Sequence, residues 1–137
     1  MERRTLALFA APCAALSLAA CAVVPPSPIV SSDREIAAKG ALVPFNQPVW
    51  VSNGLVVTPM RLIEDSRCPE NARCIQAGRA VLETRLDGIG WRQTVELEPG
   101  EPYTIRGETV RLTSVLPERQ AERQIPVANY RFAFDDN

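Results

Sequence analysis

The stretch that decides the fold reads Asp65-Ser66-Arg67-Cys68-Pro69-Glu70-Asn71-Ala72-Arg73-Cys74-Ile75-Gln76-Ala77-Gly78. It holds two of the four cysteines of the chain and many residues of the types that favour turns. Segments with the two-residue periodicity of β-strands stand on both sides of it. The sequence therefore predicts a long loop between two strands, with both cysteines inside the loop.

Short strand-like segments continue outward from this loop in both directions, and turn residues separate them. Pro59 interrupts the segment before the loop, which indicates an edge strand or a bulge. The predicted strands are residues 48–51, 55–64, 79–86, 91–98, 103–105, 108–116 and 127–134. About seven short strands at this spacing predict an all-β fold, either a small antiparallel β-sandwich or a small barrel.

Four of these segments also predict which side chains share a face. Placing Leu86 opposite Trp91 puts the apolar residues of that hairpin on one face, whereas a shift of one residue would expose them. The resulting pairs are Leu86–Trp91, Leu82–Val95, Ala80–Leu97, Arg79–Glu98 and Arg85–Arg92, the last of which is repulsive. The other predicted faces are Val56, Thr58, Met60 and Leu62 in one strand, and Tyr130, Phe132 and Phe134 in the last strand.

The first twenty residues have the pattern of a secretory signal peptide, in which Arg3 and Arg4 precede an apolar segment too short to span a membrane. The segment ends in Leu18-Ala19-Ala20-Cys21, which resembles the lipobox of bacterial lipoproteins. The resemblance implies cleavage before Cys21 and a lipid, including palmitate, on that cysteine. Because Ala22 and not Asp follows, it also implies sorting to the outer membrane. The alternative is an ordinary signal peptide that leaves Cys21 as a free thiol.

Composition divides the chain into three parts. They are a signal peptide at residues 1–20, a lipid-anchored flexible tether at residues 21–41 and a β-sandwich-like domain at residues 42–137. Prolines favour an extended first half of the tether. In its second half, Ser32 and Glu35 have the spacing of a capping box, so a short helix ending near Lys39 and a disordered linker are both open interpretations.

Residue counts exclude several functions. The chain has no histidine, which rules out Ser-His-Asp and Cys-His catalysis and imidazole ligation of a metal. Its 15 basic and 16 acidic side chains give a net charge of −1, which does not favour nucleic acid. Carboxylates remain for catalysis, but Glu64 and Asp65 point to opposite faces of a strand, and Glu96 and Glu98 lie on a predicted solvent face. We predict that the protein is not an enzyme and holds no metal or cofactor.

Cys68 and Cys74 are predicted to form a disulfide, because they are the two thiols left once residues 1–20 are removed and Cys21 is lipidated. A metal site made from these two thiolates would lack further ligands. A redox pair normally has only two residues between its cysteines, not five.

Four other residues of the loop are candidates for a role in its structure or in binding. Asp65 can accept backbone N–H groups in an Asx-turn, and Gly78 permits a bulge. Arg67 and Arg73 are expected to be solvated, although a stapled loop could also insert them into a partner, as the loops of protease inhibitors do.

Asp65-Ser66-Arg67-Cys68-Pro69, followed by Cys74-Ile75 and Ala77-Gly78, resembles the signature of a family of uncharacterised bacterial lipoproteins and secreted β-domains. The similarity continues more loosely through Trp91, residues 110–117 and residues 130–132, and so covers most of the mature domain. Family members often have Trp where this chain has Gln76. The resemblance implies location and domain extent, and it brings no activity, substrate or catalytic residue.

These observations predict a lipid-anchored β-domain of the bacterial cell envelope with a non-enzymatic binding or structural role. The expected location is the outer membrane, facing the periplasm. The expected partners are the membrane, through the lipid, and an unidentified envelope protein or component, and not nucleic acid. The alternatives are a carboxylate-dependent envelope hydrolase and a protease inhibitor that acts through residues 65–78.

Overall fold

The computed structural model describes residues 33–137. The predicted signal peptide, the predicted lipidation site Cys21 and the first part of the predicted tether lie outside these residues. Within the described residues, no helix is long and apolar enough to cross a membrane.

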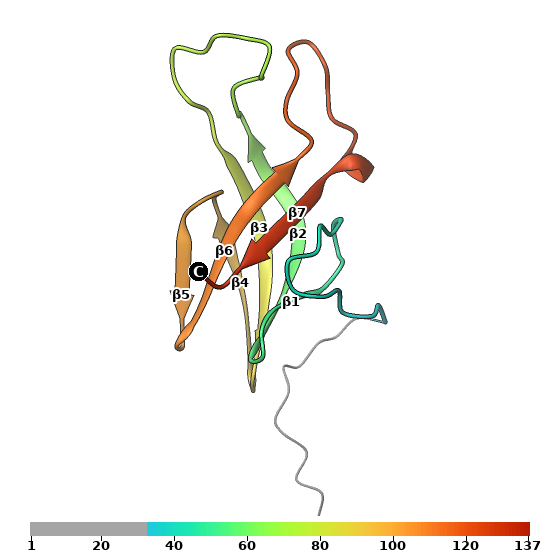
Figure 1. Ribbon diagram of the computed structural model, residues 1–137, viewed down its shortest axis with the longest axis vertical. Helices are drawn as coiled ribbons and strands as arrows, with labels where there is room; N and C mark the ends of the chain where they lie inside the picture. Colours follow the sequence, from blue (N-terminus) through green and yellow to red (C-terminus); the bar gives the residue numbers. More distant parts are fainter. Residues whose placement is uncertain (1–32) are drawn as a thin grey trace, which may run out of the picture.

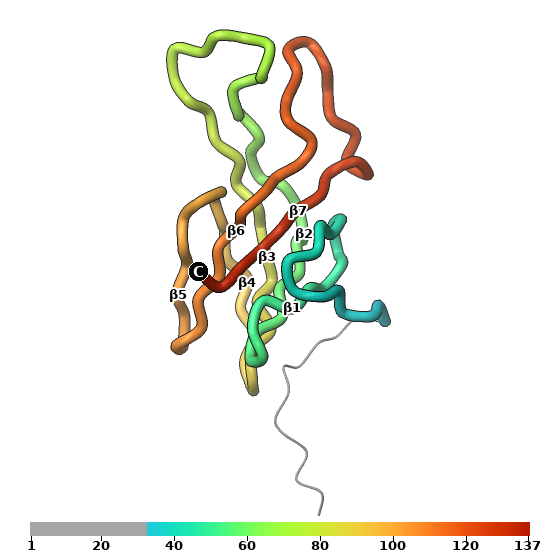
Figure 2. The backbone as a smooth tube through the Cα atoms, in the orientation of Figure 1, coloured from blue at the N-terminus to red at the C-terminus, as the bar shows by residue number. Residues whose placement is uncertain are grey.

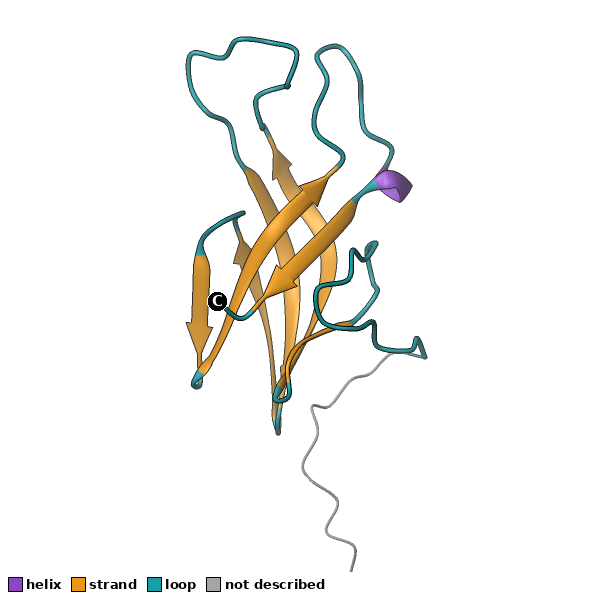
Figure 3. Cartoon of the chain, viewed as in Figure 1, coloured by secondary structure: helices purple, strands orange, loops and turns teal. Residues whose placement is uncertain are grey.

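Within residues 33–137, seven strands form two antiparallel sheets that face each other, which confirms the all-β prediction (Figures 1 and 3). The first sheet has the order β1-β2-β3-β4, with β1 Val49–Ser52, β2 Leu55–Asp65, β3 Ala80–Gly88 and β4 Trp91–Leu97. The second has the order β5-β6-β7, with β5 Pro102–Ile105, β6 Glu108–Leu116 and β7 Arg131–Asp135. A 3-10 turn, η1 at Val127–Asn129, precedes β7. Within the described residues, each strand pairs only with a strand that directly precedes or follows it in the sequence, and β4 does not pair with β5. The connection between β4 and β5 therefore links the two sheets.

The core lies between the two sheets, and the last strand supplies its largest side chains. Phe132 and Phe134 are almost completely buried and Tyr130 is 8% exposed, so the predicted apolar face of this segment is confirmed. The Phe45 ring packs edge-on against Phe132, with ring centroids 4.8 Å apart. Aromatic pairs in this geometry add about 0.5–1.5 kcal/mol beyond the area that they bury.

The β3–β4 hairpin keeps the predicted faces, but its predicted register is wrong by two residues. Gly88, and not Leu86, is opposite Trp91. A two-residue turn with φ +76° at Gly90 therefore closes the hairpin. The reason is steric, because the indole of Trp91 lies over Gly88, where an added Cβ would come within 2.1 Å of it. A shift of two residues preserves the alternation, so Trp91 is partly buried against the core and Arg92 is exposed, as predicted.

The corrected register also removes the predicted repulsion between Arg85 and Arg92. Arg92 now lies opposite Asp87, and Arg85 lies opposite Thr94. The Asp87 side chain is completely buried and accepts hydrogen bonds from Nε of both arginines, the Arg85 bond measuring 3.0 Å. A buried carboxylate requires such partners, so the two arginines neutralise the one acid between them. The predicted attraction between Arg79 and Glu98 is also present, at 3.1 Å.

The core side of β2 changes at a β-bulge. Pro59 lies opposite Thr84 and Arg61 lies opposite Glu83, which are adjacent in β3. Met60, between them in β2, therefore has no partner in β3 and forms the bulge. The predicted bulge is thus present next to Pro59. β1 pairs with β2 only at residues 55–57, so within the described residues no strand pairs with β2 on the β1 side at Pro59 either. The prediction that residues 56, 58, 60 and 62 share one face is wrong, since the extra residue moves the core side from odd to even positions. The β2 residues in the core are Leu55, Val57 and Leu62.

The end of the predicted tether packs on the domain and contains no helix from residue 33 onward. Ala37 donates its N–H to Pro48 O at 2.8 Å and accepts from Trp50 N at 3.0 Å. Lys39 Nζ lies 2.7 Å from the Asp136 carboxylate. The folded domain therefore begins before residue 42, where the sequence placed its start.

Candidate functional site

Two long loops stand next to each other at one end of the sandwich (Figures 1 and 2). The first, residues 66–79, connects β2 to β3 and contains the cysteines. The second, residues 117–126, connects β6 to η1. We call them the disulfide loop and the opposite loop. Loops at the ends of a β-sandwich are common places for binding residues, because the sheets hold them in position.

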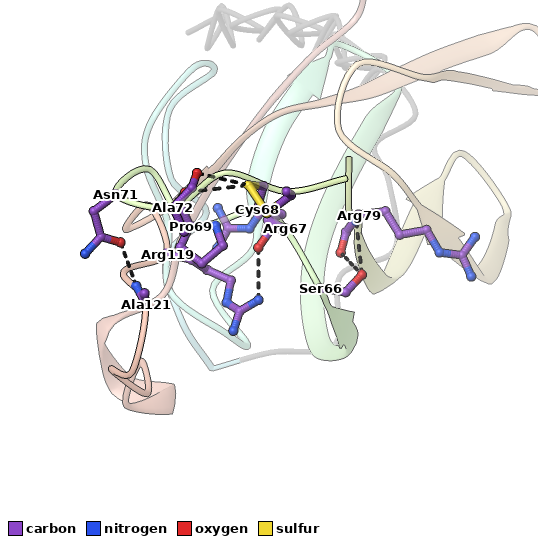
Figure 4. The surroundings of a disulfide bond; sticks show 10 residues. Ser66, Arg67, Cys68, Pro69, Asn71, Ala72, Arg79, Arg119 and Ala121 are labelled. Atoms are coloured by element: carbon purple, nitrogen blue, oxygen red, sulfur yellow. Dashed lines mark hydrogen bonds between the residues drawn. A yellow bond between two sulfur atoms is a disulfide. The ribbon is translucent and has the colours of Figure 1, made fainter. Parts of the chain in front are cut away.

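Cys68 and Cys74 form the predicted disulfide, with their Cα atoms 5.9 Å apart (Figure 4). Cys68 is partly buried and Cys74 is exposed. The disulfide therefore closes the tip of the disulfide loop at the surface of the domain.

Reduction of this disulfide is expected to destabilise the domain by about 2 kcal/mol, the chain-entropy value for a loop of this length. For a domain of about 100 residues, this corresponds to a decrease in Tm of about 8–16 °C. Differential scanning calorimetry with and without reductant measures the shift, and a Cys68→Ala, Cys74→Ala variant should melt like the reduced protein. A Tm that does not change on reduction would show that the disulfide does not constrain the fold.

Gly78 ends the disulfide loop at a very close contact between backbones. A Cβ at this position would lie 1.5 Å from Ser66 O, which no side chain could occupy. Ser66 N in turn donates to Arg79 O at 2.8 Å and extends the β2–β3 pairing past the end of the strands. The structure therefore gives a different reason for the glycine than the predicted bulge: only glycine lets the two arms of the loop approach this closely.

Arg67 lies inside the base of the loops and joins both sheets. Its Nε and Nη2 donate to the two oxygens of Asp65 at 2.7 and 2.9 Å, a bidentate pair. Its Nη1 donates to Val115 O at 2.6 Å, and its Nη2 also reaches Pro117 O at 3.2 Å. The hydroxyl of Tyr130 donates to the same carboxylate at 2.8 Å. The Asp65–Arg67–Tyr130 cluster thus links the end of β2 to β6 and to the start of β7.

The pKa values in this cluster follow from its geometry. Burial alone would raise the pKa of the Asp65 carboxyl, but the hydrogen bonds from Arg67 and Tyr130 hold that pKa below its usual value. The pKa of Arg67 is raised, chiefly by its hydrogen bond to Asp65. Burial and the Asp65 carboxylate raise the pKa of the Tyr130 phenol to about 12. At neutral pH the cluster is therefore a charged pair with a neutral phenol as a third member.

The two arginines of the disulfide loop have different environments, which corrects the expectation that both are solvated. The side chain of Arg67 is 14% exposed and that of its partner Asp65 is 10% exposed. Arg73 is exposed at the tip, next to Ile75, whose side chain has no cover at all. The Asp65 carboxylate accepts a hydrogen bond from the backbone amide of Arg67, as the predicted Asx-turn requires, and it also binds the Arg67 side chain. Arg67 is therefore a structural residue, and Arg73 is the arginine that a partner can reach.

Hydrogen bonds join the disulfide loop to the opposite loop along their length (Figure 4). Arg119 donates from Nη1 to Arg67 O at 2.9 Å, and its carbonyl accepts from Glu70 N at 3.0 Å. Further out, Ala121 N donates to Asn71 Oδ1 at 2.7 Å. Because backbone groups take part on both sides, each loop limits the movement of the other.

A pocket of about 670 Å³ lies where the loops meet, and most of its wall comes from the opposite loop. Its volume is in the range of small-molecule sites, which are about 300–1,000 Å³. Apolar groups on its wall come from Leu116, Pro117, Ile125 and Pro126, and polar groups come from Glu70, Glu118, Gln120, Arg123, Gln124 and Asn129.

A second, smaller pocket of about 270 Å³ adjoins the first, since Arg123, Gln124 and Ile125 line both. Its other wall is formed by Asp65, Arg119 and Tyr130, so it reaches the buried cluster. Arg123 is exposed between the two pockets. The joined pockets thus combine apolar side chains on their walls with the guanidinium group of Arg123, which lines both.

The acids nominated from the sequence are not brought together. Glu64 accepts from Ser66 Oγ at 2.7 Å and from Arg79 Nε at 3.0 Å, on the exposed side of β2. Asp65 faces the other way, toward Arg67. Glu96 is exposed on β4. Within residues 33–137, no three Asp, Glu, Cys or His side chains form a group that could hold a metal ion.

Sequence reasoning missed Tyr130 and Arg119 as members of this site. Alternation with Phe132 predicts Tyr130 in the core, and its ring does lie there, but its hydroxyl reaches Asp65, 65 residues away in the sequence. The signal that could have found it is the tyrosine itself, because a buried phenol requires a hydrogen-bond partner. For Arg119, which lies in a polar segment, the sequence carries no such signal.

The described residues define a small β-domain of two sheets. Its disulfide loop and opposite loop lie at one end of the domain and line the two pockets there. No family model, curated protein or solved structure matches the chain. The resemblance of the residue 65–78 motif to a lipoprotein family therefore stays a prediction from the sequence.

Proposed function

We propose that this chain is a lipid-anchored protein of the bacterial cell envelope, and that its β-domain binds an envelope component through the joined pockets at its loop end. The role is binding and not catalysis. The lipid holds the protein at the periplasmic face of the outer membrane, and the residues of the loop end meet the partner.

The observation that carries the binding role is the fixed shape of the loop end. Long loops without a function are usually mobile and variable in shape. Here a disulfide closes the tip of one loop, a buried ion pair holds its base, and hydrogen bonds tie it to the other loop. Fixing a surface before binding lowers the entropic cost of association. The pocket between the loops gives that surface a concave region to receive a ligand group.

The direction of the chain also supports the proposal. In Figure 1 the described chain begins in the lower part of the view, at residue 33, and the two loops lie at the top. An anchor on Cys21 would therefore be connected to the end of the domain away from the joined pockets. This connection is compatible with pockets that face the periplasm.

Lipidation is tested directly on the mature protein. Mass spectrometry of its N-terminus is expected to show Cys21 with a diacylglyceryl or triacyl group, and Cys21→Ser is expected to leave the chain unprocessed or to release it as a soluble protein. An unmodified Ala22 or a free Cys21 at the N-terminus would refute the anchor and leave the binding role open.

Binding through the pockets is tested by capture from envelope extract, with the lipid anchor intact and three forms of the protein. Arg123→Ala changes an exposed residue that lines both pockets, and Arg61→Ala is the matched control, because Arg61 is exposed on β2. We expect the wild type and Arg61→Ala to retain the same component and Arg123→Ala to retain much less. Equal capture by all three forms would contradict binding at this site.

The exposed tip of the disulfide loop favours protease inhibition as a second candidate function. Arg73 directly precedes Cys74 and is exposed in a loop that the disulfide closes. A trypsin-like protease would recognise its guanidinium group. Inhibition of such a protease by the wild type but not by Arg73→Ala would support this function, and no inhibition across a protease panel would dismiss it. Arg67→Ala is unsuitable for this test because Arg67 supports the fold.

A further inference from the structure

Four strands form the edges of the two sheets, and β4 differs from the other three. β1 has four residues and is bridged by Ala37, β5 has four residues and begins with Pro102, and β7 exchanges two hydrogen bonds with Val43. β4 has seven residues, no proline and no bulge, and within residues 33–137 it pairs only with β3. A long, regular strand edge offers backbone groups to another strand, and native proteins usually protect such edges.

The hydrogen-bonding direction of β4 follows from its hairpin. Gly88 and Trp91 flank a two-residue turn, so their backbone N–H and C=O groups form hydrogen bonds with each other. In an antiparallel pair such bonds recur at every second residue, so the odd-numbered residues of β4 bond to β3. The other edge of β3 agrees, because the carbonyl of the odd-numbered Arg79 accepts a hydrogen bond from the β2 side. The N–H and C=O groups of Arg92, Thr94 and Glu96 therefore point away from β3, toward the open edge.

The charged side chains along this edge complement those of a second, antiparallel copy of β4. Arg92, Thr94 and Glu96 are exposed on the outer face of β4. An antiparallel copy centred on Thr94 would place Arg92 opposite Glu96 twice and the two threonines opposite each other. Registers centred on Arg92 or Glu96 would put like charges face to face, and a register centred on residue 93 would leave the charges without an opposite partner in the other copy. A register centred on residue 95 would bring Arg92 opposite Glu98, but Glu98 lies beyond the end of β4 and is bonded to Arg79 of its own chain. Opposite charges directly across a sheet stabilise it, and like charges destabilise it.

Two further features fit the same register. On the inner face it pairs Trp91 with Leu97, two residues that pack on the core and would extend it across the junction. Glu96 faces Glu83 across the β3–β4 pairing, so within one chain it has an acid opposite it. Arg92 also binds the buried Asp87 of its own chain, but Asp87 carries one charge against the two of Arg85 and Arg92. Arg92 of a second copy would therefore still bring net positive charge beside Glu96.

We infer that β4 is the site at which two copies of this chain associate, antiparallel and centred on Thr94, so that the two four-stranded sheets become one continuous sheet. Three residue pairs, each exchanging two backbone hydrogen bonds, form the junction. The surface lies along the side of the domain, apart from the joined pockets, so the association does not depend on the proposed binding function.

The test is disulfide cross-linking of the full chain in membranes of expressing cells. Thr94→Cys places two thiols opposite each other on the two-fold axis, within the Cα separation of about 5.5 Å that a disulfide accepts. We expect a dimer on a non-reducing gel after mild oxidation. Gln93→Cys, one residue away and also exposed, and Thr104→Cys on the exposed side of β5 are expected to remain monomeric. No dimer from Thr94→Cys, or equal dimer from all three variants, would overturn the proposal.

A charge reversal separates specific pairing from collision. Glu96→Arg in the Thr94→Cys chain puts arginine opposite Arg92 of the other copy, while within its own chain it faces Glu83, so the domain should fold. Cross-linking is expected to fall about tenfold. Glu101→Arg, an exposed acid outside β4, is expected to leave cross-linking unchanged. Cross-linking that Glu96→Arg does not reduce would overturn the register and the proposal with it.

Discussion

Arg67→Ala is expected to destabilise the domain by about 3 kcal/mol, a large part of the stability of a small domain. The reason is that Asp65 stays buried after the substitution and loses the cation that holds it. The carbonyls of Val115 and Pro117 lose their donor at the same time. Unfolding in urea, followed by circular dichroism, measures the change.

Arg73→Ala is the matched control for this prediction. It removes the same side chain from the same loop, but Arg73 is exposed. Its effect on the free energy of unfolding is expected to stay below about 0.5 kcal/mol. Equal losses for the two variants would show that the bidentate pair does not support the fold.

The effect of Arg67→Ala should also depend on pH. In the wild type the pKa of Asp65 is lowered on folding, so its contribution to stability is present above the unfolded pKa of about 4 and is lost as pH falls through the folded pKa. In the variant, burial without a cation disfavours the charged carboxylate, and protonation at low pH relieves that cost. The difference in stability between the two proteins should therefore shrink as pH falls below about 4. A difference that is constant from pH 7 to pH 3 would contradict a role for the Asp65 charge.

Gly78→Ala is expected to be the second large effect, at about 3 kcal/mol, the upper end of what overpacking usually costs. The new methyl group would lie 1.5 Å from Ser66 O, which is backbone and cannot move aside like a flexible side chain. The two arms of the disulfide loop must separate, which breaks the hydrogen bond from Ser66 N to Arg79 O. Thermal unfolding measures the loss, and amide hydrogen exchange at Ser66 reports the broken bond.

Gly100→Ala is the control for the general cost of replacing a glycine. Gly100 has a φ of +85°, which alanine adopts only with strain, but a Cβ there would meet nothing within 4 Å. We expect a loss of about 1 kcal/mol, from backbone strain alone. If Gly78→Ala costs no more than Gly100→Ala, the close approach of the two arms is not needed for folding.

The two substitutions act on the same structure, because Arg67 and Gly78 hold the base of the disulfide loop from opposite ends. Loosening either end should also release the opposite loop, which is bonded to Arg67 O and Glu70 N. Capture of a partner by the joined pockets should therefore weaken in both variants under conditions where the sheets remain folded. Only Arg123→Ala separates binding from stability, since it changes an exposed residue of the pockets.

The fold class and the disulfide were predictable because local chemistry determines them. Alternating apolar residues separated by turn residues predict strands at close to their observed bounds. The two thiols that would remain after the predicted export and lipidation predict their own pairing. The core face of β7 and the opposite sides of Trp91 and Arg92 follow from the same alternation. A strand places neighbouring side chains on opposite faces wherever the strand lies, so this information needs no tertiary structure.

What only the tertiary structure decided depends on how distant segments meet. The hairpin register was wrong by two residues because such a shift keeps every side chain on its predicted face, and only the contact of Trp91 with Gly88 and the burial of Asp87 select between the registers. Arg67 is a second case, since nothing in its own loop shows that Asp65, Tyr130 and two carbonyls of the other sheet surround it. Periodicity determines the face on which a residue lies, and packing between distant segments determines its partners.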